Sequence, residues 1–359
     1  MTAVPGESVS IRPQRPGTAS AARAAVAIIQ KAAIPANFRF ILMFHLPNLL
    51  YKCEIGEIRK IMAAIFLILA FQFAIVPVPG IGAGDAITYI HSERSMQPGE
   101  VILLEIRSYQ PLQGLRIVAF KREFPAVSED GGLHWTGLVG IDLETKPGRC
   151  VLEFNGVGKN GTRVNGGGTL TVTAKKFPER RLTVNEKYVT PPASALARIR
   201  EESNRVNEIF SATTPQKIWQ GPFRRPVPGQ VISVFGTRSI YNGKPRSPHA
   251  GVDFRGSSGT PVRAPNSGIV SLASNLYYSG NTVILDHGLG LYSYFGHMSV
   301  SLVKEGDRVE TGDIIGEIGA TGVVTGPHLH WTVRLNTSRV DPLSLIHVLG
   351  GPPKQGQEK

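Results

Sequence analysis

Cysteine is scarce in this sequence, since Cys53 and Cys150 are the only two in 359 residues. They fall on opposite sides of an apolar run at residues 61–76, so we expect no structural disulfide between them. The scarcity of cysteine does not argue against export, because domains of this size can bury enough apolar surface to be stable without disulfides. Stability must therefore come from packing rather than from cross-links.

Acidic side chains are also few relative to basic ones, with 27 Asp and Glu against 39 Lys and Arg, a net charge of +12. Such an excess points to an anionic partner, and nucleic acid is the usual first candidate. No stretch resembles a nucleic-acid-binding module, so we expect no nucleic-acid partner. An anionic cell wall or membrane surface accounts for the charge equally well.

The N-terminal part lacks any clear period. Residues 1–42 are Ala-rich and basic, so 1–60 is predicted to be a disordered or cytoplasmic segment, with Met43 a plausible alternative start. The run at 61–76 follows basic residues and precedes the small residues of 80–84, which is the order of a secretory signal. The segment 61–84 could instead remain as a membrane anchor, since its length is near the lower limit for a span, or form a buried helix. Both favoured outcomes predict an exported protein of the periplasm or cell envelope, possibly anchored in the inner membrane.

From residue 85 to 184 the sequence changes to short β-rich runs separated by Gly and Pro, at a spacing typical of an immunoglobulin-like sandwich. His91 and His134 have no obvious partners there and are predicted to lie on the surface. We expect a spacer or binding module.

Residues 177–184 and 188–192 are interpreted as a linker, and the segment 185–225 is expected to include a helix. Ser194 could cap that helix, whose apolar positions recur at near-helical spacing and predict packing on the next domain. A β-rich domain is predicted at 226–345 and a tail at 346–359. The segment 304–316 resembles the hairpin of lipoyl and biotinyl carriers, but it lacks their modifiable lysine turn and is better assigned to the β scaffold.

Three short clusters in the C-terminal part carry the chemistry: 249–253, 294–297 and 328–330. A lone histidine is a weak signal, because most are surface or core residues. Together the clusters supply four histidines and one aspartate, the ligand inventory of a zinc hydrolase that uses nitrogen and oxygen ligands only.

The spacing supports a shared site. His328 and His330 lie two apart in a run rich in β-formers, so both imidazoles face the same side of a strand. His249 and Asp253 would lie roughly 13 Å apart on a straight strand, too far to bind one ion. The chain between them must therefore curl, and Gly251 is expected to supply the backbone freedom for that turn.

In their order these motifs resemble the lysostaphin type of zinc metallopeptidase, a family that cuts peptide cross-links in bacterial cell walls. The resemblance covers roughly residues 231–342 and includes supporting segments at 235–238, 286–290 and 319–322. It implies Zn²⁺ as cofactor, with His249, Asp253 and His330 as metal ligands and a water in the fourth position. It also implies that His297 and His328 are the catalytic histidines, one as base and one as stabiliser of the oxyanion, in an order that the sequence leaves open.

Other residues of this part have lesser expected roles. His287 is predicted to be structural, His347 has no expected partner, and Tyr241 is a candidate substrate contact. The predicted protein is thus mainly β, an immunoglobulin-like sandwich followed by a metallopeptidase domain. The predicted function is zinc-dependent endopeptidase cleavage of peptidoglycan cross-links. The alternative is a catalytically silent wall-binding regulator of another hydrolase, whose signature would be missing ligands, and none is missing.

Overall fold

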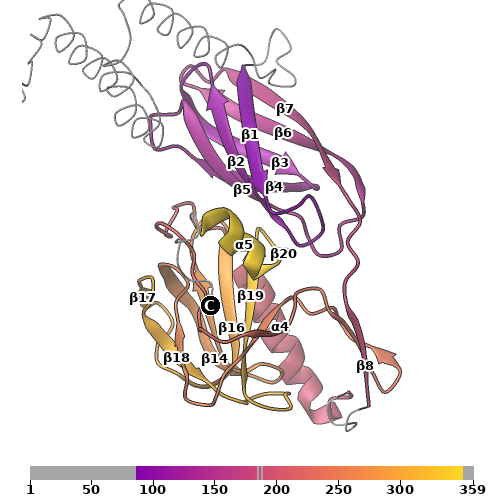
Figure 1. Cartoon of the computed structure of the whole chain (residues 1–359). Helices are drawn as coiled ribbons and strands as arrows, with labels where there is room; N and C mark the ends of the chain where they lie inside the picture. The colour runs from indigo at the N-terminus through magenta and orange to yellow at the C-terminus, as the bar shows by residue number, and fades with distance from the viewer. Residues whose placement is uncertain (1–85, 184–185, 187–188, 351–359) are drawn as a thin grey trace, which may run out of the picture. The chain divides into compact units, whose positions relative to one another are not determined.

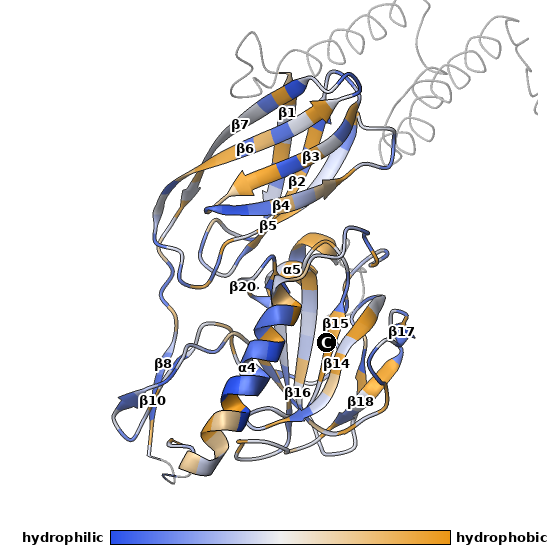
Figure 2. Ribbon diagram, turned by 180° about the vertical axis from the view of Figure 1, so that it is seen from behind, coloured by the Kyte–Doolittle hydropathy of each residue, from blue (hydrophilic) through white to orange (hydrophobic). Residues whose placement is uncertain are grey.

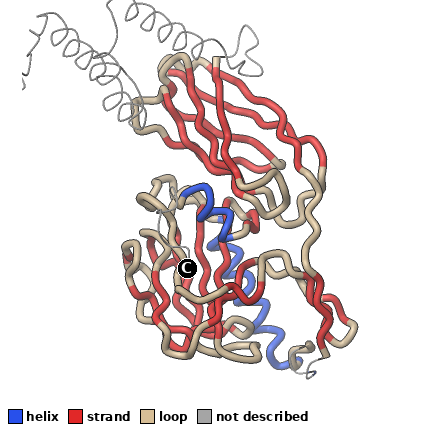
Figure 3. The backbone as a smooth tube through the Cα atoms, viewed as in Figure 1, coloured by secondary structure: helices blue, strands red, loops and turns tan. Residues whose placement is uncertain are grey.

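The structure, a computed structural model, describes residues 86–183, 186 and 189–350. The predicted N-terminal segment, the signal or anchor at 61–84, and Cys53 lie outside these residues. Within the described part, no helix combines the length and the hydropathy that a bilayer crossing requires. Strands and loops make up nearly all of this part, and α4 and α5 are its α-helices (Figure 3).

Seven antiparallel strands form the first domain (Figure 1). They are β1 (Ile87–Glu93), β2 (Val101–Ser108), β3 (Leu112–Ala119), β4 (Arg122–Val127), β5 (His134–Gly140), β6 (Gly148–Gly158) and β7 (Arg163–Val172). The strand order β1-β2-β5-β4 on one side and β3-β6-β7 on the other is that of a constant-type immunoglobulin domain, so this prediction is confirmed. Strand β4 also pairs with β3, which joins the two halves.

Burial alternates along these strands, as expected when one face of each sheet packs against the other. On β6, for example, Leu152 and Phe154 are fully buried whereas their neighbours are exposed. Cys150 is a free thiol. His91 and His134 lie on the surface as predicted, but the expectation that they lack partners is wrong, because His91 contacts Glu93 and His134 contacts Asp130.

The segment at 177–184, predicted as linker, contains a strand. Strand β8 (Glu179–Leu182) pairs in parallel with β10 (Arg238–Tyr241), which in turn pairs with β11 (Lys244–Pro245). All four residues of β8 are exposed, so local hydrophobic patterning could not have predicted it. The pairing partner, about 60 residues away in sequence, determines the structure here.

Helix α4 (Leu196–Ser211) confirms the predicted helix and follows a short 3₁₀ turn at Ala193–Ala195. Ser194 is not its cap, because the N-cap residue is Ala195 and no side chain caps this end. Apolar positions are interspersed among hydrophilic ones along α4 (Figure 2). Phe210 packs with Leu272 and Tyr292 of the following sheet, so the predicted packing is confirmed.

The C-terminal domain is built on a ten-stranded sheet with the central order β17-β14-β15-β16-β19-β12-β9. Strand β18 joins it at β16 and β13, and β20 joins it at β19. The bounds are β9 (Val231–Ser233), β12 (Gly251–Arg255), β13 (Pro261–Arg263), β14 (Gly268–Leu276), β15 (Gly280–Asp286), β16 (Leu291–Ser301), β17 (Arg308–Val309), β18 (Ile314–Ile318), β19 (His328–Leu335) and β20 (Ser338–Val340). The segment that resembles a carrier hairpin thus forms β17 and β18, part of the scaffold.

Burial on β19 determines where the site forms. Leu329 and Trp331 are fully buried in the core, and so is Val333. Because side chains alternate along a strand, the even-numbered residues, His328 and His330 among them, must face the opposite side.

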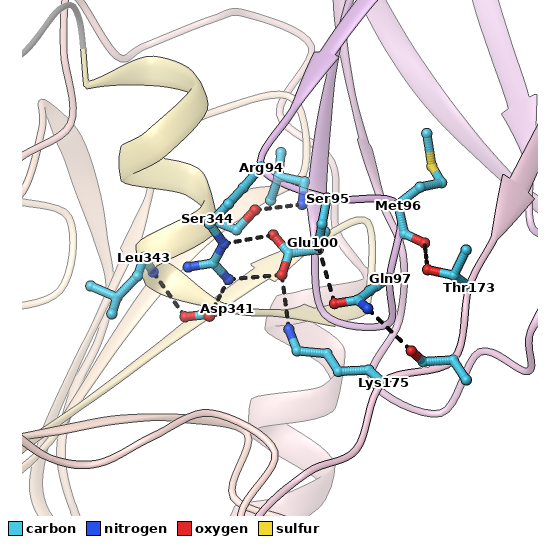
Figure 4. A network of polar contacts seen from close by, with 12 residues as sticks. Arg94, Ser95, Met96, Gln97, Glu100, Thr173, Lys175, Asp341, Leu343 and Ser344 are labelled. Atoms are coloured by element: carbon cyan, nitrogen blue, oxygen red, sulfur yellow. Dashed lines mark hydrogen bonds and ion pairs between the residues drawn. The ribbon is translucent and has the colours of Figure 1, made fainter.

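Helix α5 (Pro342–Leu349) ends the described chain, so residues 346–349 belong to a helix and not to the predicted tail. Residues from Ala86 onward belong to one compact unit. Figure 4 shows Arg94 donating to Glu100 and to Asp341, the N-cap residue of α5. The Val101 N–H also donates to the Ser344 hydroxyl, so polar contacts link α5 to the sandwich. Lys175 completes the pairing of the buried Glu100 carboxylate.

Candidate active site

Three potential metal ligands converge at strands β12 and β19. Asp253 and His330 are register partners in this antiparallel pair, and Asp253 Oδ1 lies 2.8 Å from His330 Nδ1. His249 Nε2 lies 3.0 Å from each of these two atoms. Within the described chain, no other three His, Cys, Asp or Glu side chains gather in this way.

His249 reaches the cluster from the loop that precedes β12. Its N–H donates to the Thr237 carbonyl, and its own carbonyl accepts from Gly236, which anchors the loop beside the strand. The predicted curl is therefore present, but the role expected of Gly251 is wrong. Gly251 lies within β12, and a Cβ there would come 2.4 Å from the Trp331 carbonyl oxygen. The glycine is needed for close approach of β12 to β19, not for a turn.

For both histidines, the partner of the other ring nitrogen fits the tautomer that metal binding requires. His249 Nδ1 lies 3.1 Å from the Val234 carbonyl oxygen, so it carries the proton and leaves Nε2 free to bind a metal. His330 Nε2 lies 2.9 Å from the Thr332 hydroxyl, and in the tautomer whose Nε2–H donates to this hydroxyl, Nδ1 is free. Both free lone pairs are those that point into the cluster.

The electrostatics favour the charge states that metal binding requires. Burial acts to raise the pKa of Asp253, but the adjacent imidazoles of His249 and His330 outweigh it and hold the carboxyl well below its usual range. Burial lowers the pKa of His330 despite its contact with Asp253. The aspartate is thus ionised and His330 is neutral near pH 7.

These three groups fit a tetrahedral divalent ion. With bonds of about 2.0–2.1 Å, ligand atoms of a tetrahedral zinc site lie roughly 3.3 Å apart. The observed separations of 2.8 to 3.0 Å require only a small expansion to reach that value. Two imidazole nitrogens and one carboxylate also match the donor set of catalytic zinc sites, which keep a fourth position open.

His297 enters the site through a β-bulge. Between Phe295 and Met298, strand β16 has one more residue than the facing stretch of β15. His297 itself has a left-handed φ of 65°, and its N–H donates to the Ser279 carbonyl. Simple alternation from the buried Phe295 would turn His297 toward the core, and the bulge directs it toward the three potential metal ligands instead.

His297 and His328 lie next to each other at the edge of the cluster. Their ring centroids are 4.8 Å apart, and His328 Nε2 lies 4.0 Å from Asp253 Oδ1. Each ring donates its Nδ1–H to a backbone carbonyl, of Thr321 and Gly326 respectively, which leaves Nε2 as a proton acceptor. Burial, reinforced by the neighbouring histidines, lowers the pKa of His297 to about 3.

Comparison with known proteins matches residues 247–342 to peptidase family M23. A solved structure, a putative peptidase M23 from Pseudomonas aeruginosa, is 31% identical, covers 70% of this chain and 95% of its own, and superposes with a TM-score of 0.56. The chain belongs to peptidase family M23. An uncharacterized metalloprotease of Haemophilus influenzae is 44% identical over 99 residues, 27% of this chain and 21% of that protein. Peptidoglycan DD-endopeptidase ShyA of Vibrio cholerae is 41% identical over 103 residues, 28% of this chain and 24% of that protein. The chain therefore matches about a fifth to a quarter of the length of these curated relatives.

In the M23 domain the three potential metal ligands line a cleft of about 650 Å³. Strands β8 and β10 and helix α4 contribute walls, through residues such as Arg180, Tyr241 and Phe210. Tyr241 lies at the end of β10 and lines the cleft, at a place where a substrate could contact it. His287 is fully buried and bonded through both ring nitrogens, to the Ser267 carbonyl and the Ser293 hydroxyl, so it lies outside the cleft. His347 lies in the last turn of α5.

Two further residues of the cleft, Thr332 and Arg334, are not among those predicted from the sequence. Both continue the alternation of His328 and His330 along β19, and both line the cleft. Extending the period-two pattern by four residues would have identified them.

Proposed function

We propose that this protein is a zinc-dependent endopeptidase that hydrolyses peptide cross-links of bacterial peptidoglycan. The observation that carries the proposal is the convergence of His249, Asp253 and His330 within 3.0 Å of one another, with His297 and His328 alongside in an open cleft. Membership of family M23 supports the reaction type. The names of matched relatives, peptidoglycan DD-endopeptidases among them, support the substrate.

His249, Asp253 and His330 would hold the zinc ion. When bound, zinc supplies a Lewis acid that polarises the scissile carbonyl and lowers the pKa of water from 15.7 toward about 7. The Val234 carbonyl and the Thr332 hydroxyl would keep both histidines in the tautomers that metal binding requires.

His297 and His328 would move the proton. Each ring is fixed through Nδ1–H to a backbone carbonyl, so each presents Nε2 to the substrate. One accepts the proton of the attacking water at Nε2, and the other, in the form that also carries a proton on Nε2, donates a hydrogen bond to the negative charge that develops on the carbonyl oxygen. The low pKa of His297 keeps this ring neutral in the resting site.

The proposed substrate places the working enzyme outside the cytoplasm, in the periplasm or cell envelope. A net charge of +12 suits the anionic surfaces of that compartment. The assignment of residues 61–84 as an export signal or inner-membrane anchor stays a prediction.

Digestion of purified peptidoglycan tests the proposal. The zinc-loaded chain should release fragments with new peptide termini at cross-links, which mass spectrometry identifies, and a strong chelator should stop the release until zinc is restored. His330→Ala should bind little zinc and release no fragments. Equal digestion with and without chelator would refute the proposal. A protein that holds zinc and binds the wall without cutting it would favour the regulator instead.

A further inference from the structure

Arg334 extends the face of β19 that carries the site. Side chains two apart on a strand share a face, so Arg334 follows His328, His330 and Thr332 along the cleft. Its Cα lies four residues, roughly 13 Å, from that of His330. Tyr294 lies between them on the neighbouring strand, since it pairs in register with Thr332.

The guanidinium of Arg334 is half-buried and unpaired. Its Nε is shielded from solvent and has no hydrogen-bond partner. No carboxylate or carbonyl of the described residues bonds to the rest of the group, which lies over the Phe210 ring at 5.2 Å from its centroid. Burial lowers its pKa to about 10, so it remains charged at neutral pH.

The neighbouring Arg339, by contrast, is a structural arginine whose hydrogen-bond partners lie within the protein. Arg339 is the register partner of Arg334 on β20, and its guanidinium bonds to both carboxylate oxygens of Asp142 and to Glu144. A half-buried cation without such a partner is costly, and a protein retains one most readily where a ligand completes the pairing. Arg334 lacks such a partner, and a ligand bound in the cleft could supply one.

The remaining charges of the cleft have the same sign. Arg180 donates to the Ser239 hydroxyl and Arg246 to the Val189 carbonyl, so both are held by neutral partners and keep their positive charge. The one carboxylate that lines the cleft, Asp253, belongs to the metal cluster. A cleft of this kind attracts anions.

We propose that Arg334 binds a carboxylate of the substrate, so that the cleft selects acidic peptide cross-links over neutral ones such as glycine chains. This rests on the proposed function and narrows its substrate class. The planar guanidinium suits two-point binding of a carboxylate. The spacing along β19 places that carboxylate roughly two to four residue lengths from the scissile bond.

The test uses two synthetic cross-linked peptides that are identical except that one carries free carboxylates and the other has every carboxylate amidated. The zinc-loaded wild type should cleave the free acid with a kcat/KM on the order of tenfold to a hundredfold higher, the range for a hydrogen bond to a charged group. Arg334→Gln should abolish this ratio, and Arg334→Lys should retain part of it. Arg308→Gln, an exposed arginine on β17 outside the cleft, should leave the ratio unchanged.

A second measurement separates this proposal from the proposed function. In a zinc-loaded His297→Ala chain, calorimetry measures the Kd of each peptide without turnover, with and without Arg334→Gln. A ratio of the two Kd values that falls to about one with Arg334→Gln supports the proposal. If the wild type then cuts neither peptide, only the proposed function fails. Equal Kd values for both peptides in the chain that retains Arg334 would overturn the proposal, and so would equal weakening of both by Arg334→Gln. Arg334 would then be a residue that only packs against α4.

Discussion

Asp253 and His330 face each other directly across the β12–β19 ladder, with Oδ1 and Nδ1 2.8 Å apart. The positions of these two potential metal ligands therefore depend on the register of the sheet. A slip of one residue would turn His330 into the core and Trp331 into the cleft, which the burial of Trp331 opposes. The core thus positions the ligands before any metal binds.

Gly251→Ala should damage the cluster without touching a ligand. The added Cβ would meet the Trp331 carbonyl oxygen at 2.4 Å, so β12 must move away from β19 and carry Asp253 with it. We expect a loss of about 1–3 kcal/mol in the free energy of unfolding, typical of overpacking, together with weaker zinc binding. Denaturant unfolding and metal analysis measure the two effects. Gly114→Ala, where a Cβ meets nothing within 4 Å, is the matched control, and wild-type zinc binding in Gly251→Ala would contradict the prediction.

Thr332→Val tests the tautomer assigned to His330. In this tautomer the hydroxyl, 2.9 Å from Nε2, accepts its hydrogen and so keeps Nδ1 free for the metal. The nearly isosteric valine removes this acceptor, and we expect zinc affinity to fall on the order of tenfold to a hundredfold. Competition with a chromophoric chelator measures it. Thr169→Val, at an exposed site on β7, should change nothing. Unchanged affinity in Thr332→Val would show that His330 does not depend on this bond.

His297→Ala and His328→Ala should separate catalysis from metal binding. Neither ring is among the three closest ligand groups, so both variants should retain about one zinc per chain, as His249→Ala should not. The loss of a general acid or base typically lowers the rate by about 10²–10⁴-fold. The measurement is kcat on a cross-linked peptide beside zinc content. His91→Ala, an exposed histidine of the sandwich, serves as control. If either variant loses its zinc, that histidine is a ligand and its assignment changes.

Much of the site could be predicted because it follows from alternation. His328 and His330 share a face as the period-two pattern requires, and the same rule extended would have reached Arg334. The curl at His249 also follows, since a straight strand could not bring it to Asp253.

The rest depends on contacts between distant segments. The extra residue that turns His297 into the cleft exists only relative to β15, so no local pattern marks it. The sequence suggests a turn at Gly251, because nothing local marks its close neighbour, the Trp331 carbonyl, which lies 80 residues away in sequence. Strand β8 forms from four exposed residues through its pairing with β10. In each case the local structure depends on the partner strand and cannot be predicted from the neighbouring sequence alone.

The ion pair between Asp142 of the sandwich and Arg339 of β20 should make stability depend on pH. Burial acts to raise the pKa of Asp142, but hydrogen bonds from the Arg339 guanidinium and N–H outweigh it, and the pKa falls from 3.8 to about 2. A carboxyl with a lower pKa in the folded state stabilises that state above pH 4, and the contribution disappears as pH falls toward 2. The shift corresponds to about 2 kcal/mol, or roughly 4–8 °C in Tm. Asp142→Asn should lower Tm by this amount at pH 7. It should also remove the part of the decline in Tm between pH 4 and pH 2 that this ion pair causes. Scanning calorimetry across pH measures both, with Glu105→Gln, an exposed carboxyl on β2, as the control. Parallel Tm profiles for wild type and Asp142→Asn from pH 7 down to pH 2 would show that the pair contributes nothing.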